Sequence, residues 1–205
     1  MKREGFCLLY ALLMAHMALG QQLRFGVKGG LNYANFRIKN VVGPDRLAGV
    51  NVGVMARYSF GPSNFWNIQS ELLYSAKGST DKYGLTSLGG RAIYKYRRNY
   101  LDLPILAKIN LQGLTFEAGP QLSYLVSVSD TNDNPLFQHP ARRDYNSLQL
   151  GYAAGLGYEI PVGLSLTVRY AGDVTDVYNG GGARNSVFQA QLGYLFQTKS
   201  NVSAN

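Results

Sequence analysis

The stretch that decides the fold is LQLGYAAGLGYEIPVGLSLTVRY, which runs from Leu148 to Tyr170. Apolar and polar residues alternate along both halves of it, and Pro161-Val162-Gly163 separates the halves. Alternation at a period of two places successive side chains on opposite faces of a β-strand. A short break rich in proline and glycine favours a tight turn. The stretch therefore predicts an antiparallel hairpin with one apolar face and one polar face.

The same alternation recurs along most of the chain, with gaps that are by turns long and short. Eight runs are expected to form strands: residues 23–33, 49–60, 66–77, 101–110, 116–128, 148–159, 164–170 and 188–197. Tight turns are expected at 61–64, 111–113 and 161–163, and longer polar loops at 38–46, 79–98, 129–145 and 174–185. In bacterial outer-membrane barrels, short turns face the periplasm and long loops face outward. The sequence predicts an all-β fold, an eight-stranded antiparallel up-and-down transmembrane β-barrel.

Composition indicates which strand face meets lipid. A soluble barrel encloses its apolar row, whereas a membrane barrel encloses its polar row. The polar rows are rich in Gly, Ser, Asn and Gln, which suits the narrow lumen of an eight-stranded barrel. Aromatic residues concentrate near the ends of the apolar rows, where interfacial girdles belong. Charged residues are 16% of the chain, against roughly 25% in soluble domains, so a membrane barrel is favoured.

The first twenty residues differ in character from the rest. Lys2 and Arg3 precede an apolar run that is too short to span a bilayer as a helix, and small residues end at Gly20. This pattern predicts a cleaved secretory signal peptide; a buried N-terminal helix is the alternative. The only cysteine, Cys7, lies within it, so the rest of the chain is expected to form no disulfide and no thiolate metal site. The expected division is a signal peptide at 1–20, a barrel at 21–197 and a short polar tail at 198–205.

Charged residues of the polar rows are expected to meet inside the barrel. The expected lumen network contains six cations and four carboxylates: Arg24, Lys28, Arg57, Glu71, Lys77, Asp102, Lys108, Glu117, Glu159 and Arg169. These groups should pair with one another in a narrow lumen, which predicts a plugged interior. The alternative is a small channel, which needs unpaired charges at a constriction.

Two prolines interrupt the expected strands. Pro104 and Pro120 lie at similar distances on either side of the turn at 111–113. Proline has no backbone N–H to donate to a ladder. We expect a bulge or locally weakened pairing there.

Five segments carry a family resemblance: GVKGGLN (26–32), ELLYS (71–75), YLDLPILAK (100–108), EAGPQ (117–121) and LGYLF (192–196). They resemble the PorT-like outer-membrane β-barrel family of Bacteroidota, and the likeness covers nearly all of the expected mature chain. The resemblance implies a barrel of the type seen in the OmpA membrane domain, and it implies no single activity. One relative takes part in protein secretion across the outer membrane, a role suggested here by analogy alone. The tail departs from the family pattern, because Phe196 lies nine residues before the end of the chain.

A basic and aromatic stretch precedes the fourth expected strand. Lys95, Arg97 and Arg98 lie among tyrosines there, and we expect them to contact lipopolysaccharide phosphates at the outer leaflet. A solvated loop end is the alternative. Outer-membrane lipid, lipopolysaccharide and proteins of an envelope assembly are therefore the expected partners. Nucleic acid is not expected, because the net charge of +8 is divided between lumen and loops.

One histidine raises the question of catalysis. His139 lies in the third long loop near Asp144 and Ser147, so it is a candidate general base of a lipid-modifying enzyme at the barrel rim. A loop histidine beside Pro135 and Pro140 is the interpretation we prefer. No nucleotide-binding, zinc or serine-hydrolase motif is present in the sequence. We therefore expect a monomeric, non-enzymatic outer-membrane barrel with a structural, adhesive or assembly role, and no catalytic residue, cofactor or metal.

Overall fold

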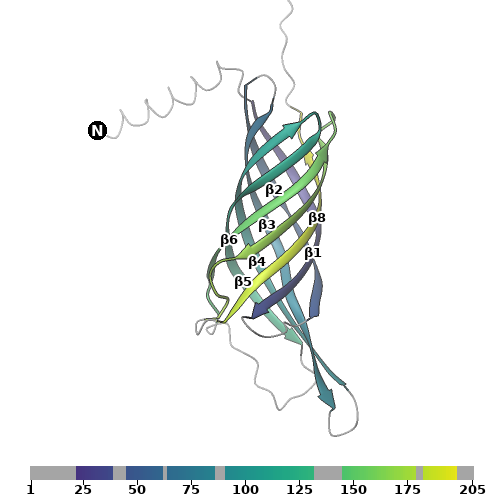
Figure 1. The fold of residues 1–205 in the computed structure, drawn as a ribbon, viewed down its shortest axis with the longest axis vertical. Helices are drawn as coiled ribbons and strands as arrows, with labels where there is room; N and C mark the ends of the chain where they lie inside the picture. Colours follow the sequence, from purple (N-terminus) through teal and green to yellow (C-terminus); the bar gives the residue numbers. More distant parts are fainter. Residues whose placement is uncertain are drawn as a thin grey trace, which may run out of the picture.

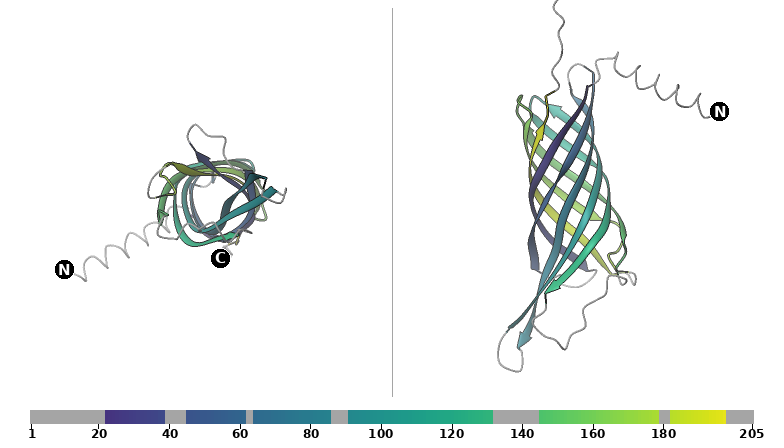
Figure 2. Two further views of the ribbon diagram at one scale, coloured as in Figure 1. Left: turned by 90° about the horizontal axis from the view of Figure 1, so that it is seen from below. Right: turned by 180° about the vertical axis from the view of Figure 1, so that it is seen from behind.

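The computed structural model describes residues 22–38, 45–61, 64–85, 91–131, 145–178 and 182–197. They form eight strands: β1 (Gln22–Ile38), β2 (Asp45–Phe60), β3 (Trp66–Leu85), β4 (Arg91–Leu111), β5 (Leu114–Thr131), β6 (Leu148–Glu159), β7 (Leu164–Asp173) and β8 (Ala183–Leu195). Each strand pairs antiparallel with its neighbours in chain order, and β8 pairs back with β1 to close a barrel (Figures 1 and 2). The predicted eight-stranded antiparallel up-and-down barrel is confirmed. Within the described ranges, no helix is long and apolar enough to cross a membrane.

The strands turn their apolar face outward and their polar face into the lumen. Leu31 of β1 and Leu148 of β6 are 65% and 61% exposed, whereas Gln69 and Gln149 are fully buried. A soluble barrel would show the reverse arrangement. Apolar side chains that interrupt the polar rows are buried as well, among them Met55, Leu73, Leu106, Leu125 and Leu195. The outer surface is therefore suited to lipid, and the core of the molecule is a polar lumen.

The barrel closes through a close approach of β1 and β8. A Cβ atom on Gly30 would lie 2.1 Å from the backbone oxygen of Ala190 in β8. A Cβ atom on the adjacent Gly29 would have no neighbour nearer than 3.6 Å. Glycine at position 30 thus allows the two backbones to approach at the seam, whereas position 29 has room for a side chain.

Two of the three expected tight turns lie wholly within the described residues. Gln112 and Gly113 both have a positive φ, of 53° and 104°, and the Gly113 N–H donates to Oδ1 of Asn110 at 2.8 Å. Gly163 has a φ of 90° in the turn between β6 and β7. Turns at 111–113 and 161–163 are thereby confirmed. Residues 62 and 63 of the third turn lie outside the described residues.

The long connections are shorter than expected, because several strands continue into them. The segment 79–98 was expected to be a loop, yet β3 runs to Leu85 and β4 begins at Arg91. Their hairpin projects beyond the rest of the barrel (Figures 1 and 2). Backbone ladder bonds do not require an apolar side-chain row, so polar strands continue to pair in water beyond the lipid-facing band.

The two prolines weaken the ladder without causing a bulge. Pro104 of β4 pairs with Gln121 of β5, and the next pair in the described ladder joins Ala107 to Ala118. The positions between them, which include Pro120, do not pair across this ladder, while the register stays the same on both sides. Weakened pairing is therefore confirmed here and a bulge at the prolines is not, because a missing N–H removes a bond without inserting a residue.

Candidate functional site

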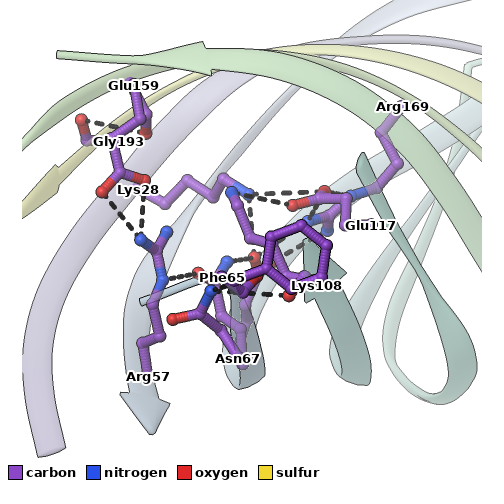
Figure 3. Close-up of polar contacts among 12 residues, drawn as sticks. Lys28, Arg57, Phe65, Asn67, Lys108, Glu117, Glu159, Arg169 and Gly193 are labelled. Atoms are coloured by element: carbon purple, nitrogen blue, oxygen red, sulfur yellow. Dashed lines mark hydrogen bonds and ion pairs between the residues drawn. The ribbon is translucent and has the colours of Figure 1, made fainter. Parts of the chain in front are cut away.

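The centre of the lumen is held by one arginine and two glutamates from three strands. Arg169 of β7 donates from Nη1 to Glu71 Oε2 at 2.7 Å and from Nη2 to Glu71 Oε1 at 2.8 Å. Its Nε donates to Oε1 of Glu117 at 2.8 Å. Glu71 lies on β3 and Glu117 on β5, so the guanidinium ties together strands that are not neighbours. Figure 3 shows the side chains of Arg169 and Glu117 directed toward each other.

Two lysines complete this central cluster. Lys28 of β1 lies 2.8 Å from Glu71 Oε1, and Lys108 of β4 lies 3.2 Å from Glu117 Oε2. All five side chains are at most 1% exposed. Three cations therefore face two carboxylates away from bulk solvent, where each charge is stabilised by its partners.

A second charged group, the ion pair of Arg57 and Glu159, lies toward the short turns. Arg57 of β2 donates from Nη1 to both oxygens of Glu159, at 2.8 and 2.6 Å. Its Nε donates to Oε1 of Gln69 at 2.8 Å, and Gln69 Nε2 donates to Glu71 Oε1 at 2.6 Å. Gln69 thus connects the Arg57–Glu159 pair to the central cluster. Figure 3 shows the guanidinium of Arg57 directed toward the carboxylate of Glu159.

A third group lies toward the long connections. Lys77 Nζ is 2.8 Å from Oδ1 of Asp102, and the hydroxyl of Ser123 donates to the same oxygen at 2.6 Å. The Lys77 ammonium also lies 4.6 Å from the centroid of the Tyr100 ring. Nine of the ten residues expected in the lumen network are thus brought into ion pairs with one another. The tenth, Arg24, is half-buried at the short-turn end.

The three basic residues expected to bind lipopolysaccharide do not share one surface. Lys95 and Arg97 of β4 are exposed, whereas Arg98 is fully buried. Alternation along the strand turns residue 98 away from residue 97. The expected contact of Arg98 with lipopolysaccharide is therefore wrong, because its guanidinium is enclosed within the barrel.

Arg98 instead lies within a cluster of aromatic side chains that the sequence did not predict. Its Cζ lies 4.3 Å from the ring centroid of Phe36 and 4.6 Å from that of Tyr145. Its Nη2 donates to the hydroxyls of Tyr145 at 2.9 Å and Tyr178 at 3.2 Å. Tyr145 and Tyr178 also pair as an isolated β-bridge, so the cluster ties the segments flanking β6 and β7 to the wall. Extending the period of two backward from Asp102 would have placed Arg98 inside.

Side-chain amides form a further network that sequence reasoning did not single out. Asn51 donates to Asn32 at 2.7 Å, and Gln191 donates to Asn51 at 2.9 Å. Gln189 donates to Asn32 at 3.0 Å. These bonds link β1, β2 and β8 across the closing seam. An excess of Asn and Gln on the polar rows was their only signal in the sequence.

The described site is built for charge pairing. Within the described ranges, no group of three or more His, Cys, Asp or Glu side chains could hold a metal ion. His139, the general base of the enzyme hypothesis, lies outside the described residues, as do the segments 1–20 and 198–205. The arrangement can hold strands together and obstruct ions that enter the lumen.

A closed eight-stranded barrel with an apolar outer surface and a charged lumen defines the class of outer-membrane β-barrel proteins. The family described as outer membrane protein beta-barrel domain matches residues 18–179, and the chain belongs to this family. Its fold and family make it an outer-membrane β-barrel protein. No curated protein sequence matches the chain.

Solved structures share the barrel at low sequence identity. Neisserial surface protein A (NspA) superposes with a TM-score of 0.54 and 14% identity, over 84% of this chain and 97% of that chain. Ail, the attachment invasion locus protein of Yersinia pestis, superposes with a TM-score of 0.47 and 12% identity, over 84% of this chain and 98% of that chain. OprG from Pseudomonas aeruginosa superposes with a TM-score of 0.34 and 10% identity, over 87% of this chain and 96% of that chain. At such identity the likeness to NspA shows the fold alone.

Proposed function

We propose that this protein is a non-conducting, non-enzymatic barrel that presents its long connections outside the cell, in a structural, adhesive or assembly role. The observation that carries the proposal is the guanidinium of Arg169, which bonds to Glu71 and Glu117 across the lumen. A barrel whose interior is filled by its own paired side chains has its binding surfaces outside the wall.

Energetics support a closed lumen. An eight-stranded barrel has an interior about wide enough for its own side chains. An ion that passes must separate buried pairs such as Arg57–Glu159 and Arg169–Glu71, and each separated charge loses the partner that offsets its desolvation. Successive clusters along the lumen present this obstacle more than once.

Liposome swelling tests the proposal. Liposomes that contain the folded protein are diluted into an isosmotic solution of arabinose, and light scattering follows the entry of the sugar. The proposal predicts swelling no faster than in protein-free liposomes, with a general porin as the positive control. Swelling that increases in proportion to the amount of inserted protein contradicts it.

Lipopolysaccharide is the partner we propose for the outer surface. Lys95 and Arg97 are exposed on the same strand, two residues apart, so their side chains lie on one face of β4. Arginine and lysine both bind phosphate. Replacing both residues by Gln should weaken lipopolysaccharide binding, whereas Arg184→Gln, which removes an exposed cation of β8, should leave it unchanged. Equal binding by all three proteins argues against this contact.

The PorT-like resemblance suggests a finer role. We propose that the protein is a PorT-like barrel of Bacteroidota and that it serves an assembly that exports proteins across the outer membrane. Deletion of its coding sequence should then deplete secreted proteins from the medium while leaving other outer-membrane proteins in place. An unchanged set of secreted proteins would remove the secretion role and leave the scaffold role standing.

A further inference from the structure

A pocket of about 650 Å³ lies at the short-turn end of the barrel. Its apolar lining includes Phe65, Leu111, Tyr158 and Ile160, and its charged lining is Arg24 and Glu159. Backbone bonds fix the turns around it: the N–H of Glu159 donates to the carbonyl of Gly113 at 2.8 Å. The pocket thus combines apolar side chains with two charged groups.

The positive charges beside this pocket exceed the negative ones. Arg24 of β1 and Arg57 of β2 are direct cross-strand partners, and both belong to the lumen side of their strands. Like charges placed directly opposite each other destabilise a sheet. Glu159 forms the ion pair with Arg57, and within the described ranges Arg24 has no ion pair of its own. Glu159 therefore offsets only one of the two positive charges.

Two guanidinium donors in this region lack an acceptor. The Nε of Arg24 and the Nη2 of Arg57 are both buried, and neither has a hydrogen-bond partner within the part of the chain that the structure describes. Arg57 as a whole is only 1% exposed. Buried guanidinium donors in folded proteins are normally satisfied, and carboxylate and phosphate oxygens are their strongest acceptors.

We propose that this pocket binds an oxyanion, a carboxylate or a phosphate, that is carried on a short apolar stem. The oxyanion accepts from Arg24, which lines the pocket, and the stem packs against Tyr158 and Leu111. The positive charge of Arg57, the buried cross-strand partner of Arg24, adds to the attraction without direct contact. Glu159, which also lines the pocket, competes with the anion for Arg24, so it limits the affinity. The proposal is independent of whether the lumen conducts and of what the long connections bind.

Calorimetric titration of the folded full chain tests this site. Inorganic phosphate and hexyl phosphate serve as probes, and hexanol is the neutral control. We expect saturable binding of both anions, tighter for hexyl phosphate, and none of hexanol. Arg24→Gln should weaken hexyl phosphate binding about tenfold or more, in line with the loss of a charged hydrogen bond. The matched control Arg184→Gln, at an exposed site outside this pocket, should bind as the wild type does.

Two further variants separate the site from a general effect of charge or folding. Tyr158→Ala keeps both arginines. It should weaken the binding of hexyl phosphate and leave the binding of inorganic phosphate unchanged. Glu159→Gln should tighten both anions. Binding by Arg24→Gln equal to that of the wild type, equal loss in Arg184→Gln, or no saturable binding by the wild type would each overturn the proposal.

The same titration identifies the source of the oxyanion. In non-ionic micelles without phospholipid, hexyl phosphate meets no competing headgroup. In nanodiscs that contain phosphatidylglycerol, unchanged affinity supports a free solute as the ligand, whereas weakened affinity supports a lipid headgroup at the same site. Both results support the site and differ only in its occupant.

Discussion

Glu71→Gln is the substitution that most sharply tests the central cluster. Glu71 accepts hydrogen bonds from Lys28, Gln69 and Arg169, and its side chain is fully buried. The amide keeps the shape of the side chain and removes its charge, so three buried cations are left with the single carboxylate of Glu117. Removing one partner of a buried ion pair costs about 3–5 kcal/mol, and we expect a loss of that size in the free energy of unfolding.

Arg169→Met should cost less than Glu71→Gln. Without Arg169, the two lysines still face two carboxylates, so the charges in the cluster balance. Because no buried charge is left without a partner, we expect the loss in the free energy of unfolding to stay below the about 3–5 kcal/mol expected for Glu71→Gln. This order, in which loss of the acid exceeds loss of the arginine, follows from the ratio of three cations to two carboxylates.

Equilibrium unfolding by urea in lipid vesicles measures both losses. Trp66 is the only tryptophan and is 54% exposed on the outer face, so its fluorescence reports transfer between lipid and water. Asp176→Asn is the control: its ion pair with Arg184 is exposed to solvent, and such pairs contribute about 0–1 kcal/mol. A loss below about 1 kcal/mol for Glu71→Gln, or a larger loss for Arg169→Met, would refute the reasoning.

Three further predictions concern the wall of the barrel. Gly30→Ala should lower the melting temperature in detergent, because its Cβ would lie 2.1 Å from a backbone oxygen of β8, whereas Gly29→Ala should not. Leu31→Arg, on the outer face, should reduce the stability of the inserted barrel by about 2–4 kcal/mol in vesicles, and an unchanged unfolding curve would mean that this face does not meet lipid. Arg98→Gln should speed amide exchange at Asn146, beside the aromatic cluster, and unchanged exchange would show that the cluster does not hold this segment.

Strand positions and side-chain directions could be predicted because they depend on local alternation. The period of two alone places Glu71, Glu117 and Arg169 on polar rows, and each is buried in the lumen. Partner choice could not be predicted, because it depends on the register of strands far apart in the chain. Arg169 and Glu71 are 98 residues apart in sequence, and only closure of the barrel brings them together.

The errors at the long-connection end have one physical origin. The stretch from 79 to 98 is rich in polar residues, which favours a loop in the sequence analysis. The alternation of inward and outward side chains is therefore not extended to Arg98. The ladder between β3 and β4 continues there because its backbone bonds are indifferent to side-chain polarity. Extending the period of two through that stretch would predict the longer hairpin and the inward direction of Arg98, but not its aromatic partners Phe36 and Tyr145, which lie elsewhere in the chain.

The central claim is that paired charges close the lumen, and single-channel recording in planar lipid bilayers tests it most directly. Folded wild-type protein should insert without producing discrete conductance steps at moderate voltage and salt. Regular steps of a fixed size, whose ion selectivity follows the lumen charges, would contradict a closed lumen and would make the protein a small channel.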